Sequence, residues 1–286
     1  MCRFLAYKGQ PVVMDKLIYQ PSNSLVQQSI NAHEIEEPLN GDGFGIGWYT
    51  HNLDPRPAVF VSVSPAWSNR NLRNIAPRIE SHCMFAHVRA ASFGETSESN
   101  CHPFHFREFM FMHNGSIEGF DHIKREIRHR LSDETYSWVH GQTDSEHFFG
   151  LCVDRLRRIP MGKATVATMA TIIQDVIREV KQIKESKGVK DGTWLNMALT
   201  DGHSLVAARY VSDPAETPLT LYYSSGSRYV VENGSCRMEH AESHNAAVLV
   251  VSEKLTRTEK DWNLIPANHF ILVSPGGDID LQKIDD

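Results

Sequence analysis

Cys2 and three later segments carry side chains that together could break an amide bond. The chain begins Met1-Cys2, and removal of a methionine before a small residue leaves a thiol and a free α-amino group on one residue. An N-terminal amine has a pKa near neutrality and is an established base for activating a nucleophile. Cys2 alone does not establish catalysis, because a small thiol often fills a buried apolar site.

Attack on an amide also needs donors for the oxyanion and groups that hold the charged end of the substrate. Arg89 lies in the run 86–92, which is typical of a buried strand, where a guanidinium is costly without an anion. Asn114 and Gly115 follow an apolar run and offer a side-chain amide and a backbone N–H as converging donors. Asp144, at an expected helix start, could take an ammonium group.

Each of these residues also has a structural interpretation. A lone arginine such as Arg89 more often pairs with a structural carboxylate. Asn114 followed by glycine is by itself a strong turn signal. Thr143 and Glu146 have the spacing of a capping box, so Asp144 could serve only the helix N-terminus. No single segment decides between the two interpretations.

The cysteines and histidines do not indicate a metal site or a disulfide framework. Five scattered cysteines form no CxxC pair. His102 and His105 flank a proline, which favours extended chain, and no acidic or cysteine partner stands at a familiar ligand spacing. The glycine run 41–47 fails the GxGxxG register and indicates a strand or turn where backbones pass closely. We expect neither metal nor cofactor; a metal-dependent hydrolase using the histidines from His82 to His113 is the rival.

Composition excludes some classes of partner. The chain has 286 residues, 41% of them hydrophobic, and a net charge of −6, which argues against nucleic-acid binding and against binding to an anionic membrane. The N-terminus lacks the apolar core of a secretory signal, and no stretch approaches ~18 uninterrupted apolar residues. A cytoplasmic protein is expected.

Strand and helix patterns alternate along the chain and must position these residues. Apolar or alternating runs predict early strands at 2–7, 44–50, 58–63, 83–91 and 107–113. Helical spacing predicts helices over 120–131, 148–156 and 165–187. Later strands are expected at 194–200, 204–211, 218–224, 246–252 and 268–274, with Asp201-Gly202-His203 as a hairpin turn. Packed sheets covered by helices are the economical architecture.

Taken in order, these segments resemble the class II glutamine amidotransferases, an N-terminal-nucleophile hydrolase family. The resemblance is strong over residues 2–160, and residues 196–202 and 251–255 are similar to segments of standalone YafJ-like and ergothioneine-pathway amidohydrolases. It rests on Cys2 directly after Met1 and on the segments Asn40-Gly41-Asp42-Gly43-Phe44-Gly45-Ile46-Gly47, His87-Val88-Arg89-Ala90-Ala91-Ser92, Asn100-Cys101-His102-Pro103-Phe104, His113-Asn114-Gly115 and Thr143-Asp144-Ser145-Glu146.

The resemblance implies a fold and a reaction. The fold is α+β, a four-layer αββα sandwich of two mainly antiparallel sheets. It forms a single domain over 2–286, with the catalytic motifs in 2–160 and a closing helix and strands in 161–286. Cys2 would attack the γ-carboxamide of glutamine or a γ-glutamyl amide to give a thioester that water hydrolyses. Asn114 and the Gly115 N–H would form the oxyanion hole.

The same resemblance assigns substrate binding and shows two departures. Arg89 and Ser92 would hold the substrate α-carboxylate, and Asp144 the α-ammonium. Many members have threonine where this chain has Ser92, which keeps the hydroxyl, and an aromatic residue where it has Ala90, which leaves room for larger γ-glutamyl amides. Residues 161–286 are expected only to complete the same fold, so an ammonia acceptor, if there is one, is expected on a synthase subunit, and a homo-oligomer is also open. If Met1 is retained, the alternative is a catalytically silent regulatory or binding module.

Overall fold

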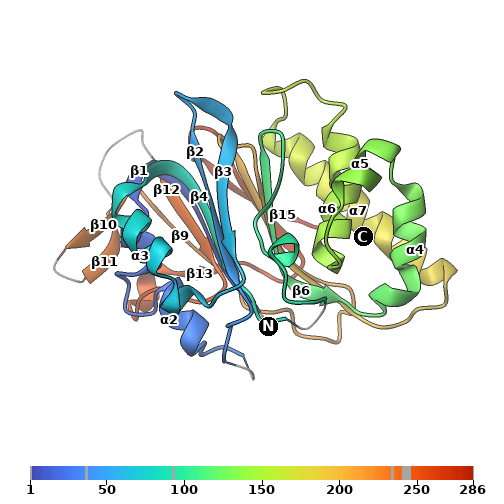
Figure 1. The fold of residues 1–286 in the computed structure, drawn as a ribbon, viewed down its shortest axis with the longest axis horizontal. Helices are drawn as coiled ribbons and strands as arrows, with labels where there is room; N and C mark the ends of the chain where they lie inside the picture. The colour runs from blue at the N-terminus through green and yellow to red at the C-terminus, as the bar shows by residue number, and fades with distance from the viewer. Residues whose placement is uncertain (1, 36–37, 92–93, 233–234, 240–245, 286) are drawn as a thin grey trace.

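Two β-sheets lie face to face in the computed structural model, and helices cover the outer face of each (Figure 1). The structure describes residues 2–35, 38–91, 94–232, 235–239 and 246–285. Every strand pairing within the two sheets is antiparallel in these residues. The expected four-layer α+β sandwich is therefore confirmed.

The first sheet has its central strand directly after Cys2. Within the described residues its order is β13-β9-β12-β1-β4-β2-β3. Strand β1 lies between β12 and β4, with Arg3 opposite Val88 and Leu5 opposite Val251. The strands are β1 (Arg3–Val13), β2 (Phe44–Thr50), β3 (Asp54–Ser62), β4 (Glu80–Val88), β9 (Tyr222–Gly226), β12 (Ala247–Val251) and β13 (Asn263–Leu264).

The second sheet carries Asn114 and Gly115. Its order in the described residues is β15-β14-β8-β7-β6-β5. The strands are β5 (Phe104–Phe106), β6 (Phe109–Ile117), β7 (Thr193–Thr200), β8 (Leu205–Val211), β14 (His269–Val273) and β15 (Ile279–Lys283). A separate hairpin joins β10 (Arg228–Glu232) and β11 (Ser235–Glu239). Both sheets thus combine early strands with strands from beyond residue 190.

Helices form the two outer layers. Those on the first sheet are α1 (Asp15–Ile18), α2 (Leu25–Ile30) and α3 (Arg70–Ile75), and those on the second are α4 (Phe120–Arg130), α5 (Asp133–Trp138), α6 (Asp144–Leu156) and α7 (Val166–Ser186). Short 3-10 turns lie at Ala66–Ser68, Ala76–Arg78, Glu98–Asn100 and Glu259–Asp261. No described helix is long and apolar enough to cross a membrane.

Three apolar clusters fill the three spaces between the layers. One packs the first sheet on α1 to α3, one lies between the sheets, and one packs the second sheet on α4, α6 and α7. Strand β1 alternates between two of them, since Phe4 lies in the cluster between the sheets and Leu5 in the outer one. The same alternation turns Cys2 toward the space between the sheets and Arg3 toward the outer helices.

Most of the expected elements are present, with shifted ends. Helix α7 matches the long helix expected over 165–187, and β2 matches 44–50. The glycine run does bring backbones close, because a Cβ on Gly45 would lie 2.1 Å from the carbonyl oxygen of His102. Gly202, with φ +85°, lies in the expected turn between β7 and β8. The reading of Asn114 and its glycine as a turn is wrong, because both lie inside β6.

Candidate active site

Cys2 directly precedes the first residue of β1 and lies beside the C-terminal end of β4. Its Sγ is 3.5 Å from the carbonyl oxygen of Ala90, the residue after Arg89. The side chain is half-buried. Burial raises the pKa of the Cys2 thiol above its ordinary value, and the positive charges of Arg89 and Arg3 oppose that rise. The thiol therefore stands next to the arginine that the sequence singled out.

The other four cysteines, all in the described part of the chain, are buried. Burial raises the pKa of Cys83 to about 12 and that of Cys101 to about 11. It also raises the pKa values of Cys152 and Cys236. Because thiolate character and exposure decide cysteine reactivity, Cys2 is the cysteine best placed to react.

Arg89 is held by the glycine-rich segment and by the loop that follows β4. Its backbone N–H donates to Gly43 at 2.9 Å, and its carbonyl accepts from Asp42 at 3.0 Å. The buried guanidinium donates through Nη1 to the carbonyl oxygen of Glu95 at 3.3 Å. Asp42 also accepts from the N–H of Ala91 at 2.8 Å. The glycine-rich segment thus fixes the chain on both sides of Ala90, which the Cys2 thiol contacts.

Asn114 and Gly115 lie on the second sheet. Asn114 is fully buried and follows Met110 and Met112 onto the face toward the first sheet. Its Oδ1 has no hydrogen-bond partner among the described residues, and its Nδ2 makes only a long 3.5 Å contact. Gly115 has φ +149°, and a Cβ there would lie 2.0 Å from the carbonyl oxygen of Trp194. The geometry therefore requires glycine at 115 and leaves the Asn114 amide incompletely satisfied.

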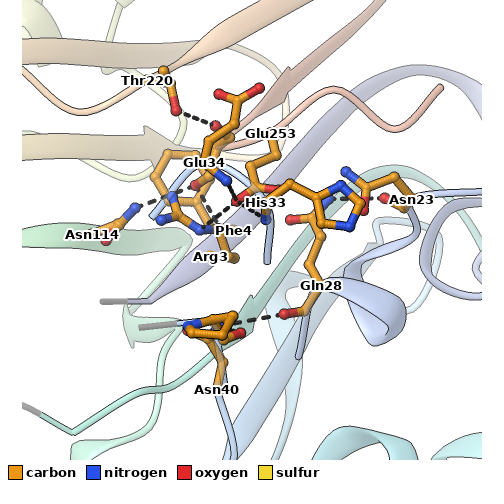
Figure 2. Close-up of polar contacts among 12 residues, drawn as sticks. Arg3, Phe4, Asn23, Gln28, His33, Glu34, Asn40, Asn114, Thr220 and Glu253 are labelled. Atoms are coloured by element: carbon orange, nitrogen blue, oxygen red, sulfur yellow. Dashed lines mark hydrogen bonds and ion pairs between the residues drawn. The ribbon is translucent and has the colours of Figure 1, made fainter. Parts of the chain in front are cut away.

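The hydroxyl of Ser252 joins the two sheets at this point. Ser252 Oγ accepts from the N–H of Phe4 at 3.0 Å and contacts Asn114 Nδ2 at 3.5 Å. Figure 2 shows Asn114 approaching the polar cluster around Arg3 and Phe4 from the opposite sheet. The strand after Cys2 and the strand that carries Asn114 therefore both contact the Ser252 hydroxyl.

Asp144 begins α6 and reaches back to β6. Thr143 caps the helix by accepting from the N–H of Glu146 at 3.2 Å, which is one half of the predicted capping box. The Glu146 carboxylate accepts instead from the N–H groups of His140 and Gly141. The carboxylate of Asp144 accepts from the N–H of Ile117 at 2.8 Å and from that of Ser145 at 2.7 Å. Asp144 thus anchors the strand that carries Asn114, in addition to any contact with substrate.

Asn100 connects the Arg89 loop to the segment before Asp144. Its Nδ2 donates to the carbonyl oxygen of Glu95 at 2.8 Å, the same oxygen that accepts from Arg89. Its Oδ1 accepts from the N–H of Gln142 at 2.8 Å. The structure therefore brings Cys2, Arg89 and Asn114 to one end of the sandwich and ties the start of α6 to them.

Sequence reasoning missed several residues of this end of the sandwich. Asn100 and Ser252 lay in recognised segments but had no assigned role, and Arg3 and Glu253, which form a buried ion pair at 3.2 Å, were not singled out. A charged residue directly after the candidate nucleophile was the available signal for Arg3. Ser92 and Met1 lie outside the described residues.

Two histidines of the rival hypothesis lie together, since the ring centroids of His87 and His102 are 4.2 Å apart. His87, His102 and His113 are buried, and burial lowers their pKa values, that of His87 to about 3. His113 lies 2.8 Å from Ser145 Oγ through Nδ1 and 3.2 Å from the Trp194 carbonyl oxygen through Nε2. Among the described residues no three His, Cys, Asp or Glu side chains are placed to hold a metal ion.

Comparison with known proteins points to one family. A family described as glutamine amidotransferases class-II matches residues 23–285. The probable glutamine amidotransferase DUG3 of Saccharomyces cerevisiae is 34% identical over 96% of this chain and 82% of its own length. The γ-glutamyl-hercynylcysteine sulfoxide hydrolase of Mycobacterium tuberculosis is 32% identical over 41% of this chain, and that match spans half of the hydrolase.

A solved structure extends the similarity to the whole chain. The glutamine aminotransferase class-II domain protein from Silicibacter pomeroyi superposes with a TM-score of 0.67. The two chains are 25% identical, and the match covers all of both. The sandwich described above is therefore the fold of that protein.

Proposed function

Because the chain belongs to the class II glutamine amidotransferases, an enzyme family that acts on glutamine or γ-glutamyl amides, we propose that Cys2 is its nucleophile. The observation that carries the proposal is the position of the Cys2 thiol, 3.5 Å from the carbonyl oxygen beside Arg89. Asn114 lies in β6 on the facing sheet, where its amide contacts Ser252 at 3.5 Å. In this proposal Cys2 is the nucleophile, Arg89 the anion-binding group and Asn114 the oxyanion donor, and the three residues lie at one end of the sandwich.

The reaction starts from the form that has lost Met1. The Cys2 thiol attacks the γ-carboxamide carbon while its own α-amino group takes the thiol proton and passes it to the leaving nitrogen. The C–N bond breaks, ammonia or an amine leaves, and a γ-glutamyl thioester remains on Cys2. Water then attacks the thioester and releases glutamate and the thiol. The amide of Asn114 and the N–H of Gly115 hold the oxyanion in both steps.

Arg89, Ser92 and Asp144 bind the amino-acid end of the substrate. The Arg89 guanidinium pairs with the α-carboxylate in a two-point geometry that lysine does not reproduce. Asp144 already accepts from two backbone N–H groups and from the Ser145 hydroxyl at 3.2 Å, but a carboxylate offers about four lone-pair sites. It therefore keeps acceptor capacity for the α-ammonium group.

The size of the leaving group that the site accepts determines which γ-glutamyl amides are substrates. Ala90, whose carbonyl oxygen contacts the Cys2 thiol, is small where many family members carry an aromatic residue. The mycobacterial relative is named as a hydrolase of γ-glutamyl-hercynylcysteine sulfoxide. We infer that this chain accepts γ-glutamyl amides larger than glutamine. Release of free ammonia and its transfer to a synthase subunit are both compatible with this chemistry.

An amidase assay with the Cys2→Ala variant tests the proposal. Glutamine and a γ-glutamyl anilide are the substrates, and ammonia or the free aniline is measured. The variant is expected to lose activity, whereas Cys83→Ala, which alters a buried thiol, is expected to keep it. Full activity in Cys2→Ala would refute the thiol mechanism. A chelator that abolishes wild-type activity would favour the metal-dependent rival.

A further inference from the structure

Arg3, the residue after the nucleophile, forms a fully buried ion pair with Glu253. The exposed fractions of the two side chains are 0% and 1%, and Arg3 Nε lies 3.2 Å from Glu253 Oε1. None of the three guanidinium nitrogens has a hydrogen-bond partner among the described residues. Figure 2 shows the pair within a polar cluster that also contains His33 and Glu34.

Glu253 holds a second part of the chain in addition to Arg3. Its carboxylate accepts from the N–H of His33, at 3.0 Å to the nearer oxygen, and from the N–H of Glu34 at 3.0 Å. The N–H of Ala32, the residue before His33, donates to the carbonyl oxygen of Pro38 at 2.9 Å. Pro38 lies four residues before Asp42, which bonds the backbone of Arg89 and of Ala91. One carboxylate therefore anchors both the strand end that carries Cys2 and the segment that closes on Arg89.

Stability does not explain why this pair is present. Taking two charges out of water is costly, and replacing a buried ion pair with apolar residues of similar volume is often neutral or stabilising. The Arg3 guanidinium, which has no hydrogen-bond partner among the described residues, recovers less of that cost than a fully bonded one. Chain ends also fray unless they are tied down, and a terminal nucleophile cannot tolerate fraying. A positional role accounts for the pair better than a stabilising one.

We propose that Glu253 is a positioning residue for Cys2. Through Arg3 it fixes the nucleophile at the end of β1, and through His33 and Glu34 it fixes the segment that supports Arg89. The two attachments keep the distance between the Cys2 thiol and the Arg89 guanidinium constant. The inference rests on the proposed function, in which Cys2 attacks a substrate held by Arg89.

The double variant R3M/E253M tests this role without leaving a buried charge unpaired. It is expected to fold, because no buried charge is left unpaired, with a lower melting temperature because the N–H groups of His33 and Glu34 lose their acceptor. Its kcat/KM for glutamine should fall about 10²-fold, as expected when a reacting group is misplaced by about 1 Å. The loss should divide between a lower kcat, because Cys2 moves, and a higher KM, because the segment supporting Arg89 loses its anchor.

Glu253→Asp provides a second test that leaves residues 1–3 unchanged. The shorter side chain keeps the charge that pairs with Arg3 but cannot reach all of its present partners. We expect a folded protein whose kcat/KM is about tenfold lower. The matched control is Glu259→Gln, which removes the exposed partner of Lys254 in the same region and should leave kcat and KM unchanged.

Wild-type kcat and KM in folded R3M/E253M would overturn the inference. If the double variant does not fold, Glu253→Asp decides: a folded Asp variant with wild-type kcat/KM overturns it, and the tenfold loss supports it. Failure of the proposed function has a different signature, because the wild type itself would then lack amidase activity.

Discussion

The Sγ atom of Cys2 lies 3.5 Å from the carbonyl oxygen of Ala90, which places the thiol beside the backbone of Arg89. That backbone is bonded to Gly43 and Asp42 of the glycine-rich segment. The end of β1, the end of β4 and the glycine-rich segment therefore form one connected unit. If the proposed mechanism is correct, changes in this unit should affect catalysis more than stability.

Arg89→Lys should weaken binding of the substrate carboxylate. Lysine keeps the charge but loses the planar two-point geometry, so kcat/KM for glutamine should fall about 10-fold to 100-fold, a cost of about 1.5–3 kcal/mol. The penalty should nearly vanish for 4-aminobutanamide, which is glutamine without its α-carboxylate. An equal penalty on both substrates would show that Arg89 acts on structure instead.

Asn114→Ala should lower kcat with little change in KM. An oxyanion donor acts mainly in the transition state, and loss of one typically costs about 10²–10³ in kcat. Stability should change little, because the amide makes only a 3.5 Å contact with Ser252. Steady-state kinetics and thermal melting measure the two quantities. Loss of stability with unchanged kcat would assign Asn114 to the core.

Gly115→Ala should destabilise the protein strongly. The new Cβ would lie 2.0 Å from the Trp194 carbonyl oxygen, and β6 cannot move away from its partner β7. Gly162→Ala is the control, since Gly162 has φ +69° but no atom within 4 Å of a Cβ; it should cost only about 1–2 kcal/mol of backbone strain. Urea denaturation gives both values. Equal losses of stability in the two variants would contradict the expected clash between a Cβ at position 115 and the Trp194 carbonyl oxygen.

Acid should destabilise the fold through His87. Burial lowers its pKa to about 3, so between about pH 6.5 and 3 the unfolded chain binds a proton that the folded chain does not. Stability should therefore fall as the pH is lowered, by about 2 kcal/mol from pH 6.5 to 5 for this residue. In the His87→Gln variant, the free energy of unfolding measured by urea denaturation should fall less between these two pH values than in the wild type. An unchanged fall would show that other groups are responsible.

The elements that sequence predicts best are those with strong internal periodicity. Helix α7 is clear because its apolar residues repeat at helical spacing over 21 residues. By contrast, β13 has two residues and β15 is mostly exposed, so neither carries an apolar pattern. Asn114 and Gly115 resemble a turn locally, but pairing with β7 keeps them in a strand. Tertiary contacts here override local propensity.

The residues of the candidate site also fall into those that the sequence identified and those that it did not. Cys2, Arg89, Asn114 and Asp144 were candidates by residue type, their roles came from the family resemblance of the ordered segments, and those roles stay predictions. Ser252 and Glu253 act through contacts with Phe4 and Arg3 across 248 and 250 positions. One sequence contains no signal for such pairings, because sheet neighbours are fixed by packing and not by separation along the chain.

Labelling of the intact protein tests the central claim most directly. A glutamine-analogue electrophile such as a diazoketone is added to freshly made protein, and intact mass and peptide mapping locate the adduct. We predict that the chain lacks Met1, that one adduct forms on Cys2, and that excess glutamine protects it. An adduct on Cys83 or Cys152, or a chain that keeps Met1 and still labels and turns over at full rate, would contradict the mechanism.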